Sequence, residues 1–210
     1  MIAAKEKCFT VKFSEIKNKR IDVLHYIPNN IICRFNCKQI NEISYNLQTG
    51  STPSGGVFAK SGVPYFRSQD LDLFNLSINQ YIDTEFHKQI ERSTVIPNDI
   101  LVAVVGASIG KIALVPNDIK EGNINQNISR IRIKNLNEIC PTYIAIYLNL
   151  FPECLIKAST VTTQPYINNT ELGNIKIPIP PIEIQNNIAD EVMDRREKAF
   201  KLQEEAKKDY

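Results

Sequence analysis

The sequence contains no tryptophan, only two histidines, and five cysteines that form no C-x-x-C pair. Because neither His25 nor His87 has a Cys, Asp or Glu at metal-binding spacing, a zinc site is not expected. An odd number of scattered cysteines fits a reduced cytosolic protein better than a disulfide framework. No apolar run approaches the roughly 18–20 residues of a membrane span, and the N-terminus lacks the order of a signal peptide. These absences predict a cytoplasmic protein with no bound metal or cofactor.

The net charge is only +2, which is low for a protein that coats DNA without sequence preference. The charge is unevenly spread, since residues 1–60 hold nine Lys and Arg against four Asp and Glu, and residues 181–210 hold six against eight. A basic front and a mixed, slightly acidic end fit a DNA-facing body with a protein-facing tail. Ordinary surface variation explains the same imbalance equally well.

A length of 210 residues is enough for one sizeable domain with an appendage. Residues 49–62 contain four of the eight glycines and are predicted to be a loop, which leads into a short strand at residues 63–66. The apolar run at residues 100–105 predicts a buried strand. A turn at 106–110 and a second strand at 111–115 complete a predicted hairpin.

Alternation over residues 129–134 predicts a half-exposed strand, with Ile131 and Ile133 on one face and a basic face opposite. A short amphipathic helix is predicted at residues 141–150, with a proline in its first turn. Residues 175–181 contain three prolines, which predicts an edge strand or an extended connector.

Nothing interrupts a helix from Ile182 to the end of the chain. Its apolar residues recur at spacings of four and three, which is typical of a coiled-coil seam, with Arg195 as a polar interruption. The predicted helix-interface residues are Ile188, Val192, Ala199, Leu202 and Ala206. We expect an α+β fold with a mixed, mostly β body at residues 1–181 and one long spacer or dimerisation helix at residues 182–210.

Catalytic motifs are missing from the sequence. Residues 106–112 resemble a phosphate-binding loop, but the spacing is one residue short and Ile112 replaces the hydroxyl that would hold magnesium. Neither a Pro-Asp…Glu-x-Lys nuclease arrangement nor the Asn/Asp-Pro-Pro-Tyr/Phe tetrapeptide of amino-group DNA methyltransferases occurs, because Pro180-Pro181 is followed by Ile182. We therefore expect no catalytic residue.

Polar side chains that bind base edges and phosphates gather in a few segments of the chain. Asn and Gln bond adenine in two places, Arg bonds guanine in the same way, and a lysine beside a glycine loop is suited to phosphate. Polar loops are common in proteins without DNA, so this pattern is weak alone. The predicted DNA-binding residues are Thr49, Ser51, Thr52, Ser54, Lys60, Arg67, Ser68, Gln69, Ser108, Lys111, Asn123, Asn125, Gln126, Asn127, Thr162, Thr163, Gln164 and Tyr166.

The order of these motifs resembles the target recognition domain of type I restriction–modification specificity subunits. The family's first signature, a Gly-x-Thr-Pro-Ser loop before a short Pro-aromatic strand, is similar to residues 50–54 and 63–67. Its central signature, a proline turn, an apolar strand and a Gly-x-x-x-Gly-Lys hairpin, is similar to residues 96–101 and 106–111.

Three further elements of the family follow in the same order. An Asn-Gln element is similar to residues 125–126, and a Gln before an Asn-x-x-x-Leu segment is similar to Gln164 and residues 169–172. An Ile-Pro-x-Pro-Pro segment and a helix-starting Gln are similar to residues 177–181 and Gln185. The likeness covers about residues 40–208, and its weight comes from five motifs in order.

The resemblance implies that the body recognises about half of a bipartite DNA site through the major groove, and that the helix sets the distance to the other half. It implies as partners double-stranded DNA, methyltransferase (modification) subunits that methylate adenine with S-adenosylmethionine, and a restriction subunit. The helix would pair with a second recognition half or with a second copy of the chain.

This sequence departs from the family in carrying one recognition domain and one long helix, where full-length specificity subunits carry two of each. A half-subunit that dimerises, an isolated half of a longer gene, and the terminal recognition domain of a fused type II restriction–modification enzyme all fit this departure. A pure protein-interaction module remains the alternative from another functional class. The sequence leaves the target bases and the oligomeric state open.

Overall fold

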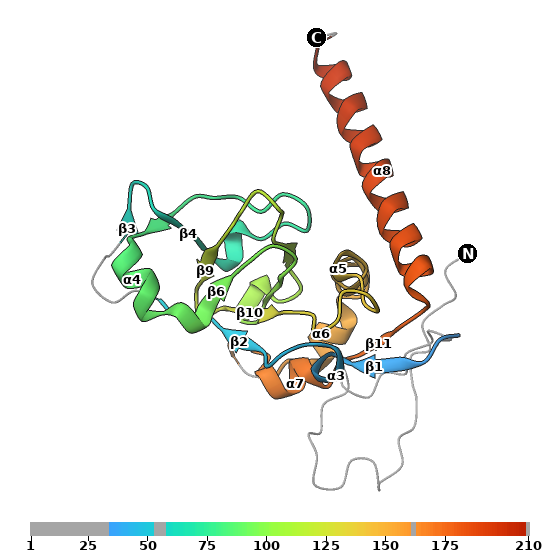
Figure 1. Cartoon of the computed structure of the whole chain (residues 1–210), viewed down its shortest axis with the longest axis horizontal. Helices are drawn as coiled ribbons and strands as arrows, with labels where there is room; N and C mark the ends of the chain where they lie inside the picture. Colours follow the sequence, from blue (N-terminus) through green and yellow to red (C-terminus); the bar gives the residue numbers. More distant parts are fainter. Residues whose placement is uncertain (1–33, 53–57, 161–162, 209–210) are drawn as a thin grey trace, which may run out of the picture.

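A computed structural model describes residues 34–52, 58–160 and 163–208. They form a mixed body of three small sheets and short helices, from which one long helix projects (Figure 1). The strands are β1 (Cys37–Gln39), β2 (Gln48–Thr49), β3 (Phe58–Ala59), β4 (Val63–Phe66), β5 (Tyr81–Ile82), β6 (Thr94–Val95), β7 (Ile100–Ala103), β8 (Ile112–Leu114), β9 (Gly122–Ile124), β10 (Ile128–Ile131) and β11 (Lys176–Pro178). The helices are α3 (Ile40–Ile43), α4 (Thr84–Gln89), α5 (Pro141–Leu150), α6 (Glu153–Ala158), α7 (Asn169–Gly173) and α8 (Ile182–Lys208), with 3₁₀ turns η1 (Ser68–Asp70), η2 (Glu91–Ser93) and η3 (Gly106–Ser108).

The central sheet has the order β2-β10-β7-β8, and all of its pairs are antiparallel. Strands β7 and β8 form the predicted hairpin around η3, with Val102 opposite Ile112. Gly106 and Gly110 adopt φ angles of 65° and 97°, which L side chains rarely adopt, so glycine suits both ends of this turn. All four residues of β7 are buried, which confirms the buried strand predicted from the apolar run.

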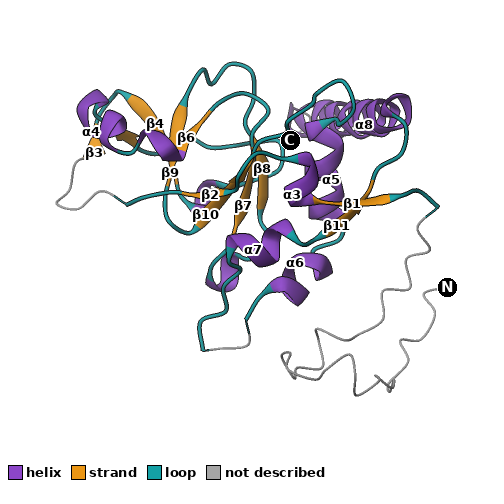
Figure 2. Cartoon of the chain, turned by 60° about the horizontal axis from the view of Figure 1, so that its bottom comes forward, coloured by secondary structure: helices purple, strands orange, loops and turns teal. Residues whose placement is uncertain are grey.

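The second sheet has the order β3-β5-β4-β9-β6. Its strands pair antiparallel except for β4 and β9, which run parallel with Tyr65 opposite Asn123. The predicted strand at residues 63–66 is confirmed as β4. The predicted loop at residues 49–62 is only partly right, because Thr49 belongs to β2 and residues 58–59 form β3. Figure 2 shows this sheet beside the central one, with α4 at its far end.

Strand β10 lies between two hydrophobic clusters, which corrects the expectation of an exposed basic face for Arg130, whereas Arg132 is half-buried and Lys134 is exposed. Ile131 and Ile133 belong to the larger cluster under α3, α5 and α7, whereas Ile128 belongs to a smaller cluster with Phe66 and Leu101. All four residues of β10 are buried. Alternation of apolar and basic residues does not distinguish water from a second packed layer when the basic side chains have long apolar stems.

Helix α5 begins at Pro141 as predicted, but it is not amphipathic. Six of its ten residues are buried, because the helix packs against β8 on one side and α8 on the other. Only its last residues, Asn149 and Leu150, are exposed. The predicted edge strand at the prolines is confirmed as β11, which pairs only with β1 among the described residues.

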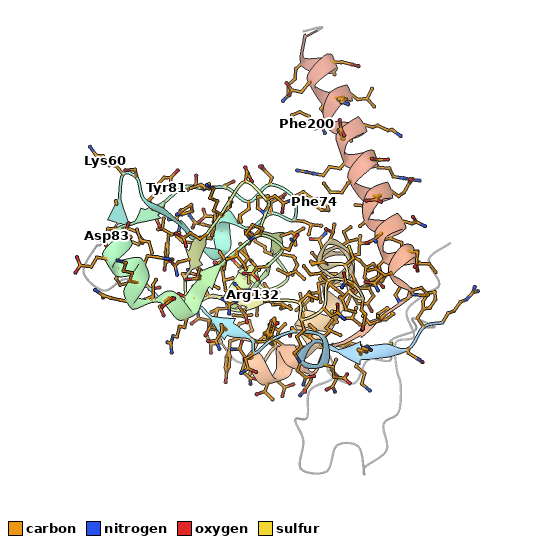
Figure 3. The ribbon with its side chains drawn as sticks, viewed as in Figure 1. Lys60, Phe74, Tyr81, Asp83, Arg132 and Phe200 are labelled. Carbon is orange, nitrogen blue, oxygen red and sulfur yellow. The ribbon has the colours of Figure 1, made fainter. Side chains whose placement is uncertain are left out.

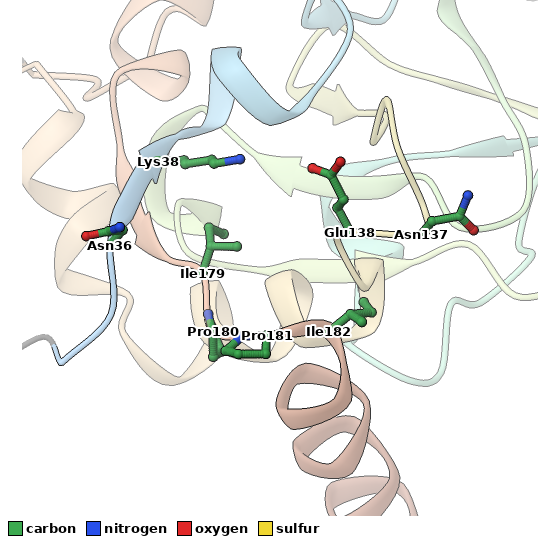
Figure 4. A pocket seen from close by; sticks show the side chains of 8 residues that line it. All are labelled: Asn36, Lys38, Asn137, Glu138, Ile179, Pro180, Pro181 and Ile182. Atoms are coloured by element: carbon green, nitrogen blue, oxygen red, sulfur yellow. The ribbon is translucent and has the colours of Figure 1, made fainter.

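Helix α8 leaves the body at the end of β11 and extends away from it (Figure 1). Its first turns are anchored by Gln185, whose side chain is fully buried. The Gln185 Oε1 atom accepts from the Cys140 amide at 2.9 Å, and its Nε2 atom donates to the carbonyls of Glu138 and Pro180 at 2.9 and 2.8 Å. Beside this anchor a cavity of about 380 Å³ is lined by Lys38, Glu138 and the proline segment before the helix (Figure 4).

Farther along α8 the contacts with the body become sparse. Ala189 is buried, and the Arg196 guanidinium lies over the ring of Phe74 at 5.0 Å from its centroid. Beyond that point Phe200 and Leu202 are 61% and 65% exposed. Figure 3 shows Phe74 at the edge of the body that faces the helix, and Phe200 on the part of the helix beyond it.

The α+β fold with a mostly β body and a long final helix is thus confirmed. None of the helices among the described residues is both long and apolar enough to cross a membrane.

Candidate DNA-recognition loops

Two segments that are far apart in the sequence meet at Gly50. The Gly50 and Ser51 amides donate to the carbonyls of Ile128 and Ile124 at 3.2 and 3.0 Å. A Cβ atom on Gly50 would lie 1.9 Å from the Ile124 carbonyl oxygen, so no other residue fits this position without moving backbone. The buried Tyr65 hydroxyl donates to the Ser51 carbonyl at 2.8 Å, and burial raises the pKa of Tyr65.

Three further contacts extend this junction into one group of loops. The Asn125 amide donates to the Phe66 carbonyl at 3.0 Å, which links the end of β9 to the segment after β4. The Val104 amide donates to the Asn127 carbonyl at 2.9 Å, and the Gly106 amide to the Pro165 carbonyl at 2.8 Å. We name segments 49–52, 67–69, 106–108, 125–127 and 163–166 the recognition loops.

The recognition loops hold most of the predicted DNA-binding residues. Gln126 is exposed between two half-buried asparagines, because the Asn125 Oδ1 atom accepts from the Asn127 amide at 3.2 Å and closes a tight turn. The exposed members are Thr52, Gln69, Gln126, Thr163, Gln164 and Tyr166. The half-buried members are Thr49, Ser51, Arg67, Ser68, Ser108, Asn125 and Asn127. Ser54 and Thr162 lie outside the described residues.

Arg67 is held in an ion pair at the edge of these loops. Its Nε and Nη2 atoms lie 3.1 and 3.2 Å from the Asp70 carboxylate, which also accepts from the Arg67 amide and from Asn79. Burial opposes ionisation of Asp70, but the hydrogen bonds from Arg67 and Asn79 outweigh it, so the pKa of Asp70 is lowered. Because the pair fixes the orientation of Arg67, a base contact by this side chain would have to form beside Asp70 or displace it.

Two predicted lysines lie outside the recognition loops, although the Lys111 amide donates to the Ser108 carbonyl at 3.0 Å. Lys60 is exposed on the turn between β3 and β4, at the far end of the second sheet near Tyr81 and Asp83 (Figure 3). Lys111 follows η3 and lines a cavity of about 610 Å³ together with Asp72 and Phe74.

Asn123 is a correction to the predicted set, because it is fully buried in β9. Its Nδ2 atom donates to the Ile90 carbonyl at 3.3 Å and to the Ser93 hydroxyl at 3.2 Å, while its Oδ1 atom is bonded to Nδ1 of His87. These bonds use both ends of the amide and join β9 to α4 and η2. His87 is therefore a buried structural residue, with Nε2 at 3.6 Å from Glu121.

Several signature residues support the fold, which sequence reasoning did not anticipate. Asn169 accepts from the Ser129 hydroxyl at 2.8 Å and donates to the Leu47 carbonyl at 3.2 Å, so it ties α7 to β10 and to the chain before β2. Gln185 anchors α8 as described above. Tyr65, which was not singled out, positions the glycine loop. No pattern in the sequence distinguishes such buried polar residues from ligand-binding ones.

The predicted helix seam is divided between the body and the solvent. Val192 is half-buried near the body, whereas Ile188, Ala199, Leu202 and Ala206 are exposed. The charged residues form ion pairs along the helix, as in Glu191–Arg195 at 2.6 Å and Glu197–Lys201 at 2.6 Å. Arg195 is exposed, and the helix interface remains a prediction.

No group of three or more His, Cys, Asp or Glu side chains within residues 34–52, 58–160 and 163–208 is placed to hold a metal ion. The chemistry of the recognition loops consists of amides, hydroxyls, one aromatic ring and a guanidinium. Such groups bind other polar molecules by hydrogen bonds.

Comparison with known proteins gives a consistent result. A family model described as the type I restriction modification DNA specificity domain matches residues 34–209. The chain is 33% identical over 133 residues to the type I restriction enzyme EcoBI specificity subunit of Escherichia coli, covering 61% of this chain and 27% of that protein. It is 29% identical over 137 residues to the putative type I restriction enzyme MjaX specificity subunit of Methanocaldococcus jannaschii, covering 62% of this chain and 32% of that protein.

Solved structures show the same fold. The HsdS subunit from Thermoanaerobacter tengcongensis matches with a TM-score of 0.59 and 20% identity, over 80% of this chain and 39% of that one. The type IIG restriction endonuclease BpuSI matches with a TM-score of 0.53 and 9% identity, over 75% of this chain and 26% of that one. The chain thus spans about a third or less of the length of the curated relatives it matches.

Proposed function

Because the chain belongs to the type I restriction modification DNA specificity domain family, we propose that it is the sequence-recognising part of a restriction–modification specificity subunit. The observation that carries the proposal is the convergence of the recognition loops. Five polar segments, spread between residues 49 and 166, are joined by backbone hydrogen bonds that they or the residues flanking them make. Amide side chains on a rigid surface can distinguish base pairs by their hydrogen-bond pattern in the major groove.

In this proposal each group of side chains has a separate task. Gln126, Gln164 and Asn125 contact base edges, whereas Lys60 and Lys111 contact phosphates on either side. The ion pair with Asp70 gives Arg67 one orientation before DNA binds, which lowers the entropic cost of a guanine contact. In this proposal the chain has no catalytic role, and bound modification subunits supply the methyl transfer to adenine. Its place of action is the cytoplasm, where the DNA that it recognises lies.

Helix α8 has a spacing function in the same proposal. A helix of 27 residues is about 40 Å long, and its C-terminal part extends past the body. We propose that Leu202 and its exposed apolar neighbours pack against a second long helix, from another recognition half or another copy of the chain. That pairing would fix the distance between two recognised half-sites.

Binding-site selection from a pool of random duplexes tests the proposal, using the full chain together with its modification subunits. We expect one defined half-site for the wild type. Gln164→Ala should change the selected bases, since loss of a good base contact costs about 1–3 kcal/mol of discrimination. Lys60→Ala should weaken binding to all sequences alike.

Asn186 provides the matched control, because it is an exposed amide on α8 and lies outside the recognition loops. Asn186→Ala should therefore select the same sequence as the wild type. Random sequences recovered with the wild type would refute the proposal and favour a pure interaction module. Identical preferred bases for Gln164→Ala and the wild type would refute the assignment of that loop.

A further inference from the structure

Two arginines of one strand segment lie near a single carboxylate, that of Asp99, and only Arg132 is hydrogen-bonded to it. Arg130 and Arg132 are two residues apart, so both side chains lie on the same side of the strand. The Nε and Nη2 atoms of Arg132 each donate to Asp99 at 2.7 Å, which uses both carboxylate oxygens. The Arg130 guanidinium donates to the Thr94 carbonyl, which also accepts from Arg132 Nη2 at 3.2 Å, and among the described residues Arg130 has no ion-pair partner. Arg130, Arg132 and Asp99 therefore carry together one positive charge that no acidic side chain of the described residues compensates.

The uncompensated charge is also poorly solvated. Arg130 is only 9% exposed, and its Nε atom has no hydrogen-bond partner among the described residues. The Thr94 hydroxyl, on the residue whose carbonyl Arg130 contacts, is buried without a partner in the same part of the chain. Burial and the charge of Arg132 lower the pKa of Arg130, yet a guanidinium stays charged at neutral pH. A buried cation without a partner is costly, and an incoming anion would remove that cost.

The cluster lies beside the recognition loops. Arg130 is paired with Gln48 in the ladder between β10 and β2, and Gln48 directly precedes the glycine loop at residues 49–52. The neighbouring turn η2, which contacts β2, carries Glu91 and Arg92, and both are exposed. The charged side chains that shift the pKa of Arg130 are those of Arg132, which lowers it, and Asp99, which raises it. Arg130, on strand β10 between β2 and β7, is thus one strand away from the segment that leads into the loops proposed to contact bases.

We propose that Arg130 is a contact for a backbone phosphate of bound DNA, with Arg132 held by Asp99 as its positioning neighbour. This inference rests on the proposed function and adds a residue to it. A guanidinium donates two parallel hydrogen bonds to phosphate oxygens, and such charge-assisted bonds are stronger than neutral ones. Because every nucleotide carries a phosphate, this contact fixes the register of the chain on the duplex and does not select bases.

The salt dependence of DNA binding tests the contact, because each neutralised phosphate adds about 0.9 to the slope of log K against log salt. We would measure this slope for the full chain with its modification subunits, as the wild type, Arg130→Met and Lys176→Met. Arg130→Met keeps the apolar stem and removes the charge, and the slope should fall by about 0.9 with the selected sequence unchanged. Lys176→Met removes an exposed charge from β11, in a different sheet, and should keep the wild-type slope.

A purely structural role predicts a different result, namely a lower melting temperature for Arg130→Met with the wild-type slope, which would overturn the proposal. If Arg130→Met does not fold, Arg130→Lys keeps the charge but loses the two-pronged donor, and it should bind every sequence more weakly by a uniform factor. Wild-type affinity for Arg130→Lys would overturn the contact. Absence of DNA binding by the wild type would refute the proposed function itself and this contact with it.

Discussion

Replacing Gln185 with leucine should loosen the whole of α8 from the recognition body. The leucine side chain has a similar size, but it leaves the Cys140 amide and the carbonyls of Glu138 and Pro180 without their partners. Each hydrogen bond contributes about 1 kcal/mol net, and unsatisfied buried groups cost more, so we expect a loss of roughly 3 kcal/mol in the free energy of unfolding. Urea denaturation of the full chain, followed by circular dichroism, measures this loss.

Two further variants sharpen that experiment. Asn186→Ala changes an exposed neighbour in the same helical turn and should alter the free energy of unfolding by less than about 0.5 kcal/mol. Gln185→Glu keeps one acceptor for the Cys140 amide but turns a carboxylate oxygen toward two carbonyls, so it should destabilise the chain at least as much as leucine does. Equal unfolding midpoints for Gln185→Leu and Asn186→Ala would refute the reasoning that this side chain anchors α8.

Three other outcomes are expected. Gly50→Ala places a Cβ atom 1.9 Å from backbone, so it should lower the free energy of unfolding by more than about 2 kcal/mol and abolish DNA binding. Gly106→Ala should lower it by only about 1 kcal/mol, because its Cβ atom would meet nothing closer than 4.0 Å and only the positive φ is unfavourable. Similar unfolding midpoints for both variants would contradict this. Because folding lowers the pKa of Asp70, the carboxylate contributes its full stability above the ordinary pKa of 3.8, and this contribution disappears as the pH falls through the pKa of the folded state. The difference in free energy of unfolding between the wild type and Asp70→Asn should therefore shrink in acid. A difference that does not change with pH would show that the ion pair has no role. Leu202→Asp should abolish self-association, or docking of a second recognition half, without changing the unfolding of the body. Sedimentation velocity tests this, and equal masses for the wild type and the variant at all concentrations would exclude Leu202 from the interface.

The sequence predicts the elements of this fold better than the roles of its polar residues. The β7–β8 hairpin and α8 follow from apolar periodicity and from glycines at the turn, which are local signals. The burial of β10 depends on a second cluster assembled from Phe66, Leu101 and other distant residues, and no local pattern contains that information. For this reason the exposure of Lys134 follows from the sequence, whereas the burial of Arg130 does not.

The same limit applies to the candidate site. Polar clusters located the recognition loops, but Asn123 and Gln126 lie close together in one polar segment, and only the second is exposed. Asn123 is buried because strand β6 and turn η2 cover β9, a long-range contact. Arg130 lacked any sequence feature that separated it from Arg132, since the difference lies in which of them reaches Asp99.

The most direct test of the central claim is a map of methylated adenines in the genomes of cells that express the modification subunits with and without this chain. The account predicts that one defined motif is methylated only when the chain is present, and that Gln164→Ala changes the bases of one half of that motif. An identical set of methylated positions with and without the chain would contradict the claim that it determines DNA sequence specificity.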